Sequence, residues 1–349
     1  METPRTSAIK RYESIDIARC FAIILVVTGH FRSEYMPHAY DVMVDVIYMF
    51  HMPLFMFVSG FLYQATRKVI PYRKFIAGKF RRLMIPYFTV SVLVILLKIF
   101  MGGIMTVDNP VTWRAFVEIL YYPAAGYFLW FIWALWWMMV IIPLFSTERS
   151  RKILLAFSAI LFFVSQDLPE IFCIDSFAKM LVFFVGGTVV ADYMKKNRIE
   201  SFSLTGQITS VIVFTVLAWL LVAGAGDNAG MAGKAILTLA ANISGIAMSM
   251  TLAYWWRIKA SGRLLAISYS VAGASYIIYL LHTTFQGFVK SLLFKIHWFD
   301  YTPQLLTAWL GAMMIIGAGV VVPWWLATQV LNRWKITAFL FSLKTRCKA

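Results

Sequence analysis

Two ionisable residues in the first apolar segment have a spacing that suits chemistry inside a membrane. Arg19 and His30 are eleven residues apart, and the residues between them are almost all apolar. In an α-helix they would lie about 20° apart around the axis and about 16 Å apart along it. A guanidinium can hold an anion, and an imidazole can take up a proton near neutral pH. Asp16, three residues before Arg19, is close enough to form an ion pair with it.

A purely structural role is the alternative for each of these two residues. Arg19 could extend to the inner membrane surface, where Asp16 would only neutralise its charge. His30 could be an interfacial histidine at the end of its helix. Their shared helix face favours a joint role, because two independent structural residues need not face the same way.

Two further histidines lie in apolar segments. His51 is about 13 Å deep by helical rise, at a level between His30 and Arg19, and Pro53 can open the backbone beside it. A histidine at that depth favours function. His282 is a fourth candidate, for which a core hydrogen bond is an equally good explanation. Trp130 belongs to an aromatic run that is typical of an interfacial belt and of helix packing.

The composition shows what must position these residues. Of the 349 residues, 61% are hydrophobic and 14% are charged, whereas soluble domains carry roughly 45–50% apolar and about 25% charged residues. We therefore predict an all-α, polytopic integral membrane protein with about ten transmembrane helices. The predicted spans are 15–31, 42–63, 83–101, 127–145, 153–166, 176–194, 207–225, 234–256, 268–290 and 303–327.

The basic residues alternate sides along this series of spans. Of 32 Lys and Arg residues, 24 fall in the two tails and the even-numbered loops, and six fall on the opposite side. This asymmetry predicts a multi-pass protein of the inner (plasma) membrane with both termini cytoplasmic. A nucleic-acid interface would concentrate its charge on one surface, so we expect no nucleic-acid partner. Basic loops can also meet anionic membrane lipid.

Metal and thiol chemistry find no support in the sequence. Cys20, Cys173 and Cys347 are scattered, without a Cys-x-x-Cys or Cys/His ligand spacing. We predict no metal site and no tightly bound cofactor.

Five stretches match the motifs of one known family in order and spacing. They are Asp16–His30 with its R-x10-H pattern, Phe50–Phe61, Lys79–Tyr87, Leu129–Phe131 and Ser275–His282. In these motifs the chain resembles the membrane acyltransferase-3 family, in its fucose 4-O-acetylase-like and polysaccharide O-acetyltransferase branch. One departure is Lys79, where the family pattern prefers arginine; lysine keeps the charge but loses the bidentate fork.

The resemblance implies one transmembrane acyltransferase domain over 1–349, with a core of about 14–330 and a cytoplasmic tail at 331–349. It implies transfer of an acetyl group from cytoplasmic acetyl-CoA, a substrate, to a hydroxyl of a glycan or lipid-linked sugar. The implied catalytic residues are His30 as general base, Arg19 on the donor side and His51 as support or proton relay. Donor binding falls to Lys79, Arg81 and Arg82, with Asp16, Ser59, Trp130 and His282 as supporting residues.

Two rival classes are compatible with intramembrane Arg and His residues. A transporter or flippase for a glycan or small solute would use them to gate its substrate or to carry protons. Weak internal symmetry would favour that class, and the sequence shows no convincing internal repeat. A membrane scaffold without chemistry would leave the Asp16, Arg19 and His30 set unexplained.

Overall fold

The computed structural model describes residues 12–102, 109–199, 203–300 and 304–345. Within these ranges every regular element is a helix, which confirms the all-α prediction. The α-helices are α1 (Glu13–Gly29), α2 (His38–Tyr48), α3 (His51–Ala65), α4 (Tyr72–Met101), α5 (Ala115–Glu118), α6 (Trp130–Ile141), α7 (Glu148–Val164), α8 (Ile174–Asn197), α9 (Leu204–Val222), α10 (Ala225–Asn228), α11 (Gly230–Lys259), α12 (Gly262–Lys295), α13 (Gln304–Trp325) and α14 (Lys335–Leu340). Cys347 and the basic residues of the N-terminal tail lie outside the described residues.

The helices confirm a polytopic membrane protein. Within the described residues, eight helical segments are long and apolar enough to cross a membrane. Helices α1 and α7, with 17 residues each, occupy the two remaining predicted spans. Helix α7 begins five residues before its predicted start, because Thr147 and Ser150 form a reciprocal capping box there. Helical structure satisfies the backbone hydrogen bonds internally, as a bilayer demands.

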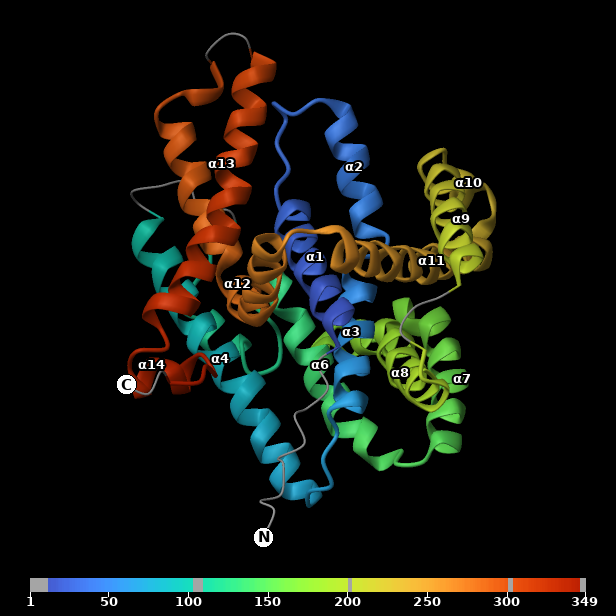
Figure 1. The fold of residues 1–349 in the computed structure, drawn as a ribbon. Helices are drawn as coiled ribbons and strands as arrows, with labels where there is room; N and C mark the ends of the chain where they lie inside the picture. The colour runs from blue at the N-terminus through green and yellow to red at the C-terminus, as the bar shows by residue number, and fades with distance from the viewer. Residues whose placement is uncertain (1–11, 103–108, 200–202, 301–303, 346–349) are drawn as a thin grey trace.

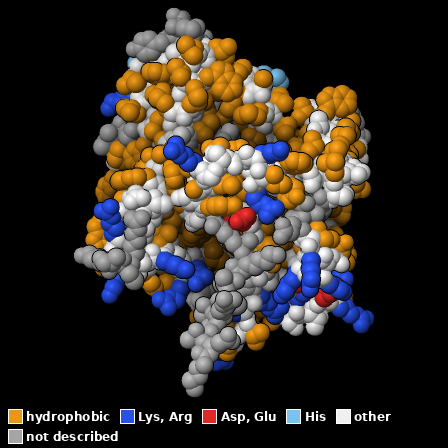
Figure 2. Space-filling model, in the orientation of Figure 1, with side chains coloured by type: hydrophobic (Ala, Val, Ile, Leu, Met, Phe, Trp, Pro, Cys, Tyr) orange, Lys and Arg blue, Asp and Glu red, His pale blue; other side chains and the backbone are white. Residues whose placement is uncertain are grey.

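Helix α1 lies in the middle of the bundle and packs against α3, α11 and α12 (Figure 1). We call the end of the bundle with the loop 30–37 the upper end and the end with the loop 66–71 the lower end, as they stand in Figure 1. Figure 2 shows hydrophobic side chains over much of this face, with most of the visible Lys and Arg side chains in its lower half. The charge asymmetry of the sequence is thus visible on the folded surface.

Helices α3 and α8 approach each other closely through two glycines. A Cβ atom on Gly60 would lie 1.9 Å from the carbonyl oxygen of Phe184, and one on Gly187 would lie 2.1 Å from that of Phe57. Only residues without a Cβ atom allow two helix backbones to approach so closely. This contact fixes α3, and therefore the residues at its upper end, against α8.

The second predicted span is not one continuous helix. Residues 42–63 were expected to form a single span, but the helix breaks at Met49 and Phe50, where Phe50 has φ −141° and ψ −16°. Pro53 lies in the first turn of α3, a position that tolerates proline because the N–H is not needed there. The break therefore precedes His51 and makes it the first residue of α3.

The basic loop predicted at 64–82 is also largely helical. Helix α4 begins at Tyr72, so that Lys79, Arg81 and Arg82 lie on it rather than in a loop. Lysine and arginine are good helix formers, and they outnumber the single poor helix former, Gly78, in 72–82, which contains no proline. The loop itself is reduced to residues 66–71.

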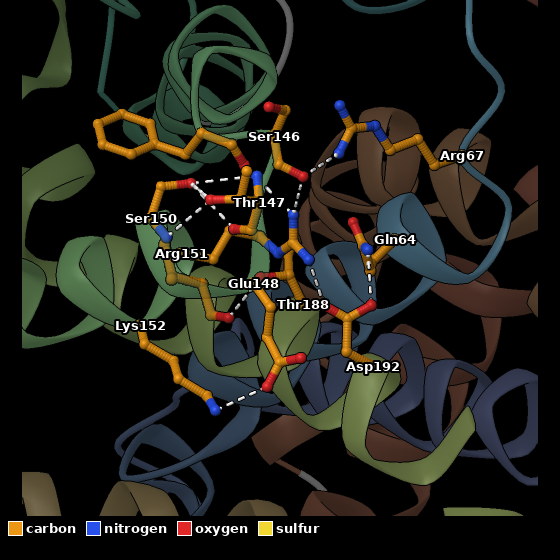
Figure 3. A network of polar contacts seen from close by, with 12 residues as sticks. Gln64, Arg67, Ser146, Thr147, Glu148, Ser150, Arg151, Lys152, Thr188 and Asp192 are labelled. Atoms are coloured by element: carbon orange, nitrogen blue, oxygen red, sulfur yellow. Dashed lines mark hydrogen bonds and ion pairs between the residues drawn. The ribbon is translucent and has the colours of Figure 1, made fainter. Parts of the chain in front are cut away.

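A network of polar contacts joins α3, α7 and α8 at the lower end of the bundle (Figure 3). Arg151 is only 4% exposed, and its guanidinium forms an ion pair with Asp192. It also donates to the carbonyl of Ser146 at 2.7 Å, while Gln64 donates to Asp192 at 2.7 Å. The network neutralises a buried charge and ties three helices together.

Candidate active site

A cavity of about 920 Å³ lies in the upper half of the bundle. It is lined by the segment directly after α1, the α2–α3 break, helices α4, α8, α11, α12 and α13, and the start of α6 with the segment before it. Its lining includes His30, His51 and Trp130, three residues that the sequence singled out. Such a volume is typical of a site for a small molecule or for one end of a larger one.

His30 stands at the C-terminal end of α1 and is half-buried at the cavity. Its Nδ1 lies 2.7 Å from the carbonyl oxygen of Val26. A carbonyl only accepts, so Nδ1 carries the proton and Nε2 keeps its lone pair. His30 is therefore held in the tautomer that a general base needs.

His51, the first residue of α3, is held in the same tautomer as His30. Its Nδ1 donates to the carbonyl of Ile47 at 2.8 Å, and its side chain is only 1% exposed. The ring of Tyr48 contacts both histidines, with centroids 4.8 Å from His51 and 6.4 Å from His30. The break between α2 and α3 thus brings the two imidazoles to one aromatic side chain.

His282 lies beside His30, behind the cavity wall. The two rings meet edge to face with centroids 4.9 Å apart, and Phe128 contacts both. His282 is fully buried and its Nδ1 donates to the carbonyl of Tyr279 at 2.7 Å. Within the described residues, its Nε2 has no hydrogen-bond partner.

Gln286 adds a polar group that the sequence analysis did not single out. It is 5% exposed, lines the cavity and donates to the carbonyl of Val27 at 2.8 Å. Its Oε1 has no partner among the described residues. The hydrogen bond holds α12 against the end of α1 that carries His30. A buried glutamine in an apolar helix was the signal that could have found it.

The upper end of α3 opens on the cavity, where His51, Met52 and Pro53 belong to the lining. The first N–H groups of a helix have no partner within the helix, and its N-terminus carries partial positive charge. Asn242 of α11 supports the break: in the amide orientation that satisfies both groups, its nitrogen donates to the carbonyls of Met49 and Thr238. This end of α3 can therefore stabilise negative charge.

Arg19 and Asp16 lie outside the cavity lining. The predicted ion pair is confirmed, with Arg19 Nη2 3.5 Å from Asp16 Oδ1. Both side chains are largely buried, at 27% and 17% exposed. The cavity reaches His30 but not the level of Arg19, about 16 Å along α1. A shared role of Arg19 and His30 stays a prediction.

The predicted donor residues are also separate from the cavity. Lys79 lies near the ring of Phe75 and Arg81 near the ring of Phe339, each 5.3 Å from the ring centroid. Nineteen residues of α4, about 28 Å of helix, separate Lys79 from Lys98 in the cavity lining. Arg82 is exposed on the same helix, and Ser59 lies outside the lining and donates to the carbonyl of Phe55.

Comparison with known proteins identifies the family. The family model described as acyltransferase domain, of the acyltransferase-3 type, matches residues 12–328. No curated protein and no solved structure matches the chain. The matched region covers most of the sequence and includes the cavity with His30 and His51, the neighbouring His282, and the basic part of α4. The chain belongs to the membrane acyltransferase-3 family and is an enzyme that transfers acyl groups.

Proposed function

We propose that this enzyme is an O-acetyltransferase of the inner membrane. It takes an acetyl group from cytoplasmic acetyl-CoA and transfers it to a sugar hydroxyl of a surface glycan or its lipid-linked precursor. This assignment places it in the fucose 4-O-acetylase-like branch of the family, whose motifs its sequence resembles. The observation that carries the proposal is His30, held at a large cavity with Nδ1 on the carbonyl of Val26 and Nε2 left as a base.

The transfer step follows from that geometry. The acceptor hydroxyl gives its proton to Nε2 of His30 as its oxygen forms a bond to the thioester carbonyl carbon. The resulting oxyanion is stabilised by the N-terminus of α3. When the carbon–sulfur bond breaks, the CoA thiolate takes the proton back from His30. His51 supports the base through Tyr48, and His282 orients it from behind.

The donor enters from the lower end in this proposal. CoA carries several phosphate charges. Lys79, Arg81 and Arg82 lie on the basic part of α4, at the end of the bundle that we expect to be cytoplasmic from the charge asymmetry. The long pantetheine arm then carries the acetyl group past the level of Arg19 toward His30. Both termini are cytoplasmic, and reporter fusions at the C-terminus and in the loop 102–126 should report opposite sides.

The direct test uses purified protein, radiolabelled acetyl-CoA and a panel of neutral and charged sugars. We expect label to move to a sugar in a form that mild alkali removes, as an O-ester requires. His30→Ala protein, shown to be folded by size-exclusion chromatography, serves as the inactive control. Label that moves only from longer acyl-CoA donors, or only to amines, would contradict the proposal.

A further inference from the structure

Gln286 lies on α12, lines the cavity and is bonded to the C-terminal end of α1. Its amide nitrogen donates to the carbonyl of Val27 at 2.8 Å, and His30 Nδ1 lies 2.7 Å from the carbonyl of Val26. Carbonyls in the last turn of a helix have no partner within the helix, so Gln286 supplies one of the missing donors. The glutamine and the proposed base are therefore held by consecutive residues of one helix.

The side chain of Gln286 is held in a single orientation. An amide nitrogen only donates and an amide oxygen only accepts, so the bond to Val27 leaves Oε1 as an acceptor. The stem of the side chain is enclosed as well, because a Cβ atom on Gly319 of α13 would lie 2.8 Å from Gln286 Cγ and 2.8 Å from Val27 Cγ1. A side chain fixed at its stem and at its nitrogen is preorganised to accept one hydrogen bond through Oε1.

The Oε1 atom of Gln286 has no partner among the described residues, although the side chain is only 5% exposed. His282, one turn earlier on the same face of α12, is fully buried and has the same property at Nε2. Its Nδ1 donates to the carbonyl of Tyr279, so Nε2 keeps its lone pair. Because a buried acceptor without a donor costs free energy, this face of α12 suits a ligand that brings O–H or N–H groups.

The chemistry of these atoms restricts what Gln286 can recognise. A carboxylate or phosphate offers only lone pairs to Oε1, whereas a sugar offers hydroxyl donors. The hydroxyl that is acylated has one proton, and in the proposed reaction this proton goes to His30. Gln286 therefore needs a second donor, and on a sugar ring the nearest one is the hydroxyl of the neighbouring carbon.

We propose that Gln286 recognises the sugar acceptor by accepting a hydrogen bond from the hydroxyl next to the acylated position. The acceptor is then a sugar with two adjacent hydroxyl groups, one for His30 and one for Gln286. This contact also decides which hydroxyl meets the base, because the ring must turn until both bonds form. The inference rests on the proposed function, since it names the class of acceptor for the same site.

The test removes each partner of the proposed bond in turn. Gln286→Met keeps most of the side-chain volume but has no amide. The acceptors are a methyl glycoside, whose acylated position is first determined by NMR, and its analogue with hydrogen in place of the neighbouring hydroxyl. Both acceptors are uncharged, so that the lysines of the lining act on each of them alike; these lysines come from three helices and are Lys98, Lys179 and Lys290.

We expect the wild type to prefer the full sugar over the deoxy sugar by about tenfold or more in kcat/KM, because the deoxy sugar leaves a buried acceptor unpaired. In Gln286→Met the two sugars should have similar kcat/KM values. A loss of activity that is equal for both sugars would show that Gln286 only holds α1, and it would overturn the proposal. An increased KM for acetyl-CoA with an unchanged sugar preference would also overturn it, because Oε1 would then bind an amide N–H of the CoA arm.

A second variant keeps Gln286 and displaces it. In Gly319→Ala the new Cβ atom would meet Cγ of Gln286, whereas in Gly317→Ala, the control on the same helix, it would meet nothing within 4 Å. We expect Gly319→Ala to reduce the preference for the full sugar several-fold and Gly317→Ala to keep it. The same preference in both glycine variants would contradict the proposal.

Sugar binding is also measured without acetyl-CoA, through quenching of tryptophan fluorescence. Binding that needs the neighbouring hydroxyl in the wild type, and no longer needs it in Gln286→Met, supports the contact even if no acetyl group moves. In that case the proposed acetyl transfer is what fails. If the wild type binds the full and deoxy sugars equally, the contact does not exist, whatever the acyl donor is.

Discussion

The cavity and the Arg151 network both place polar side chains in an apolar bundle, but only one of them has the properties of a site. Each contains buried atoms without a partner among the described residues: Nε of Arg151 and Oε1 of Gln64 in the network, Nε2 of His282 and Oε1 of Gln286 at the cavity. Unpartnered atoms alone therefore do not separate the two regions.

The space around the polar groups does separate the two regions. In the network the buried cation Arg151 meets Asp192, and its 4% exposure leaves no room for a ligand (Figure 3). At the cavity, a volume of about 920 Å³ is open to His30 and His51, whose Nδ1 atoms each lie on a backbone carbonyl and whose tautomer is thereby fixed. A neutralised, enclosed cluster stabilises the fold, whereas polar side chains at an open cavity can bind a substrate.

The largest effect that this comparison predicts is on turnover. His30→Ala removes the proposed base, and kcat should fall by roughly 10²–10⁴-fold. The temperature of unfolding in detergent should change little, because His30 is only half-buried. His38→Ala, an exposed histidine outside the cavity, is the matched control and should keep full activity. A folded His30→Ala protein with normal turnover would show that the base is His51 or another group.

In the Arg151 network we expect a substitution to lower the stability of the protein and to leave kcat nearly unchanged. Arg151→Met leaves Asp192 without its counter-charge, and the free energy of unfolding should fall by about 3 kcal/mol. The double variant Arg151→Met/Asp192→Leu should recover most of that loss, while kcat per folded molecule stays near the wild type. Unfolding curves and kcat measured on the same preparations check this. A stable Arg151→Met protein without activity would show that the network belongs to the active site.

A smaller loss of stability is expected at the α3–α8 contact. In Gly187→Ala the new Cβ atom would meet the backbone of Phe57, so that the helices must separate, at a cost of about 1–3 kcal/mol. Gly273→Ala is the control, since its Cβ atom would meet nothing within 4 Å. Thermal unfolding should separate the two variants. Equal stability would show that α3 is positioned by other contacts.

The smallest predicted effect is on binding of the acyl donor. Neutralising Lys79 and Arg82 with glutamine should raise the KM for acetyl-CoA roughly three- to tenfold and leave the acceptor KM unchanged, because exposed charge contacts are worth about 1 kcal/mol or less. The control is Arg73→Gln with Lys74→Gln, two cations in the first turns of the same helix. If both pairs raise the donor KM equally, general surface charge rather than a defined donor site is responsible.

The apolar helices were predictable because they depend on local properties. A run of apolar residues long enough for a bilayer must become a helix, whatever surrounds it. The break before His51 was not predictable in the same way. Pro53 suggested an opening, but the structure also brings in Asn242, which in the flipped amide orientation donates to the carbonyl of Met49 from another helix.

The candidate site was predictable only where a single residue is unusual in its own segment. His30, His51 and Trp130 stood out as single residues, and each lines the cavity. Lys179 and Lys290 did not stand out, because a lysine near the end of a span is common and its meaning depends on what else is near it.

The sequence by itself thus determined which segments are apolar enough to cross a membrane, how the basic residues alternate between the segments that join them, and which histidines lie within the apolar segments. These follow from hydrophobic length and from charge counts, which each segment carries alone. Only the tertiary structure decided that His30 meets His282 and that the basic part of α4 is separate from the cavity. It also decided that lysines from three helices face one volume. Such contacts join residues far apart in the chain, and they are fixed by how the helices pack, not by any one helix.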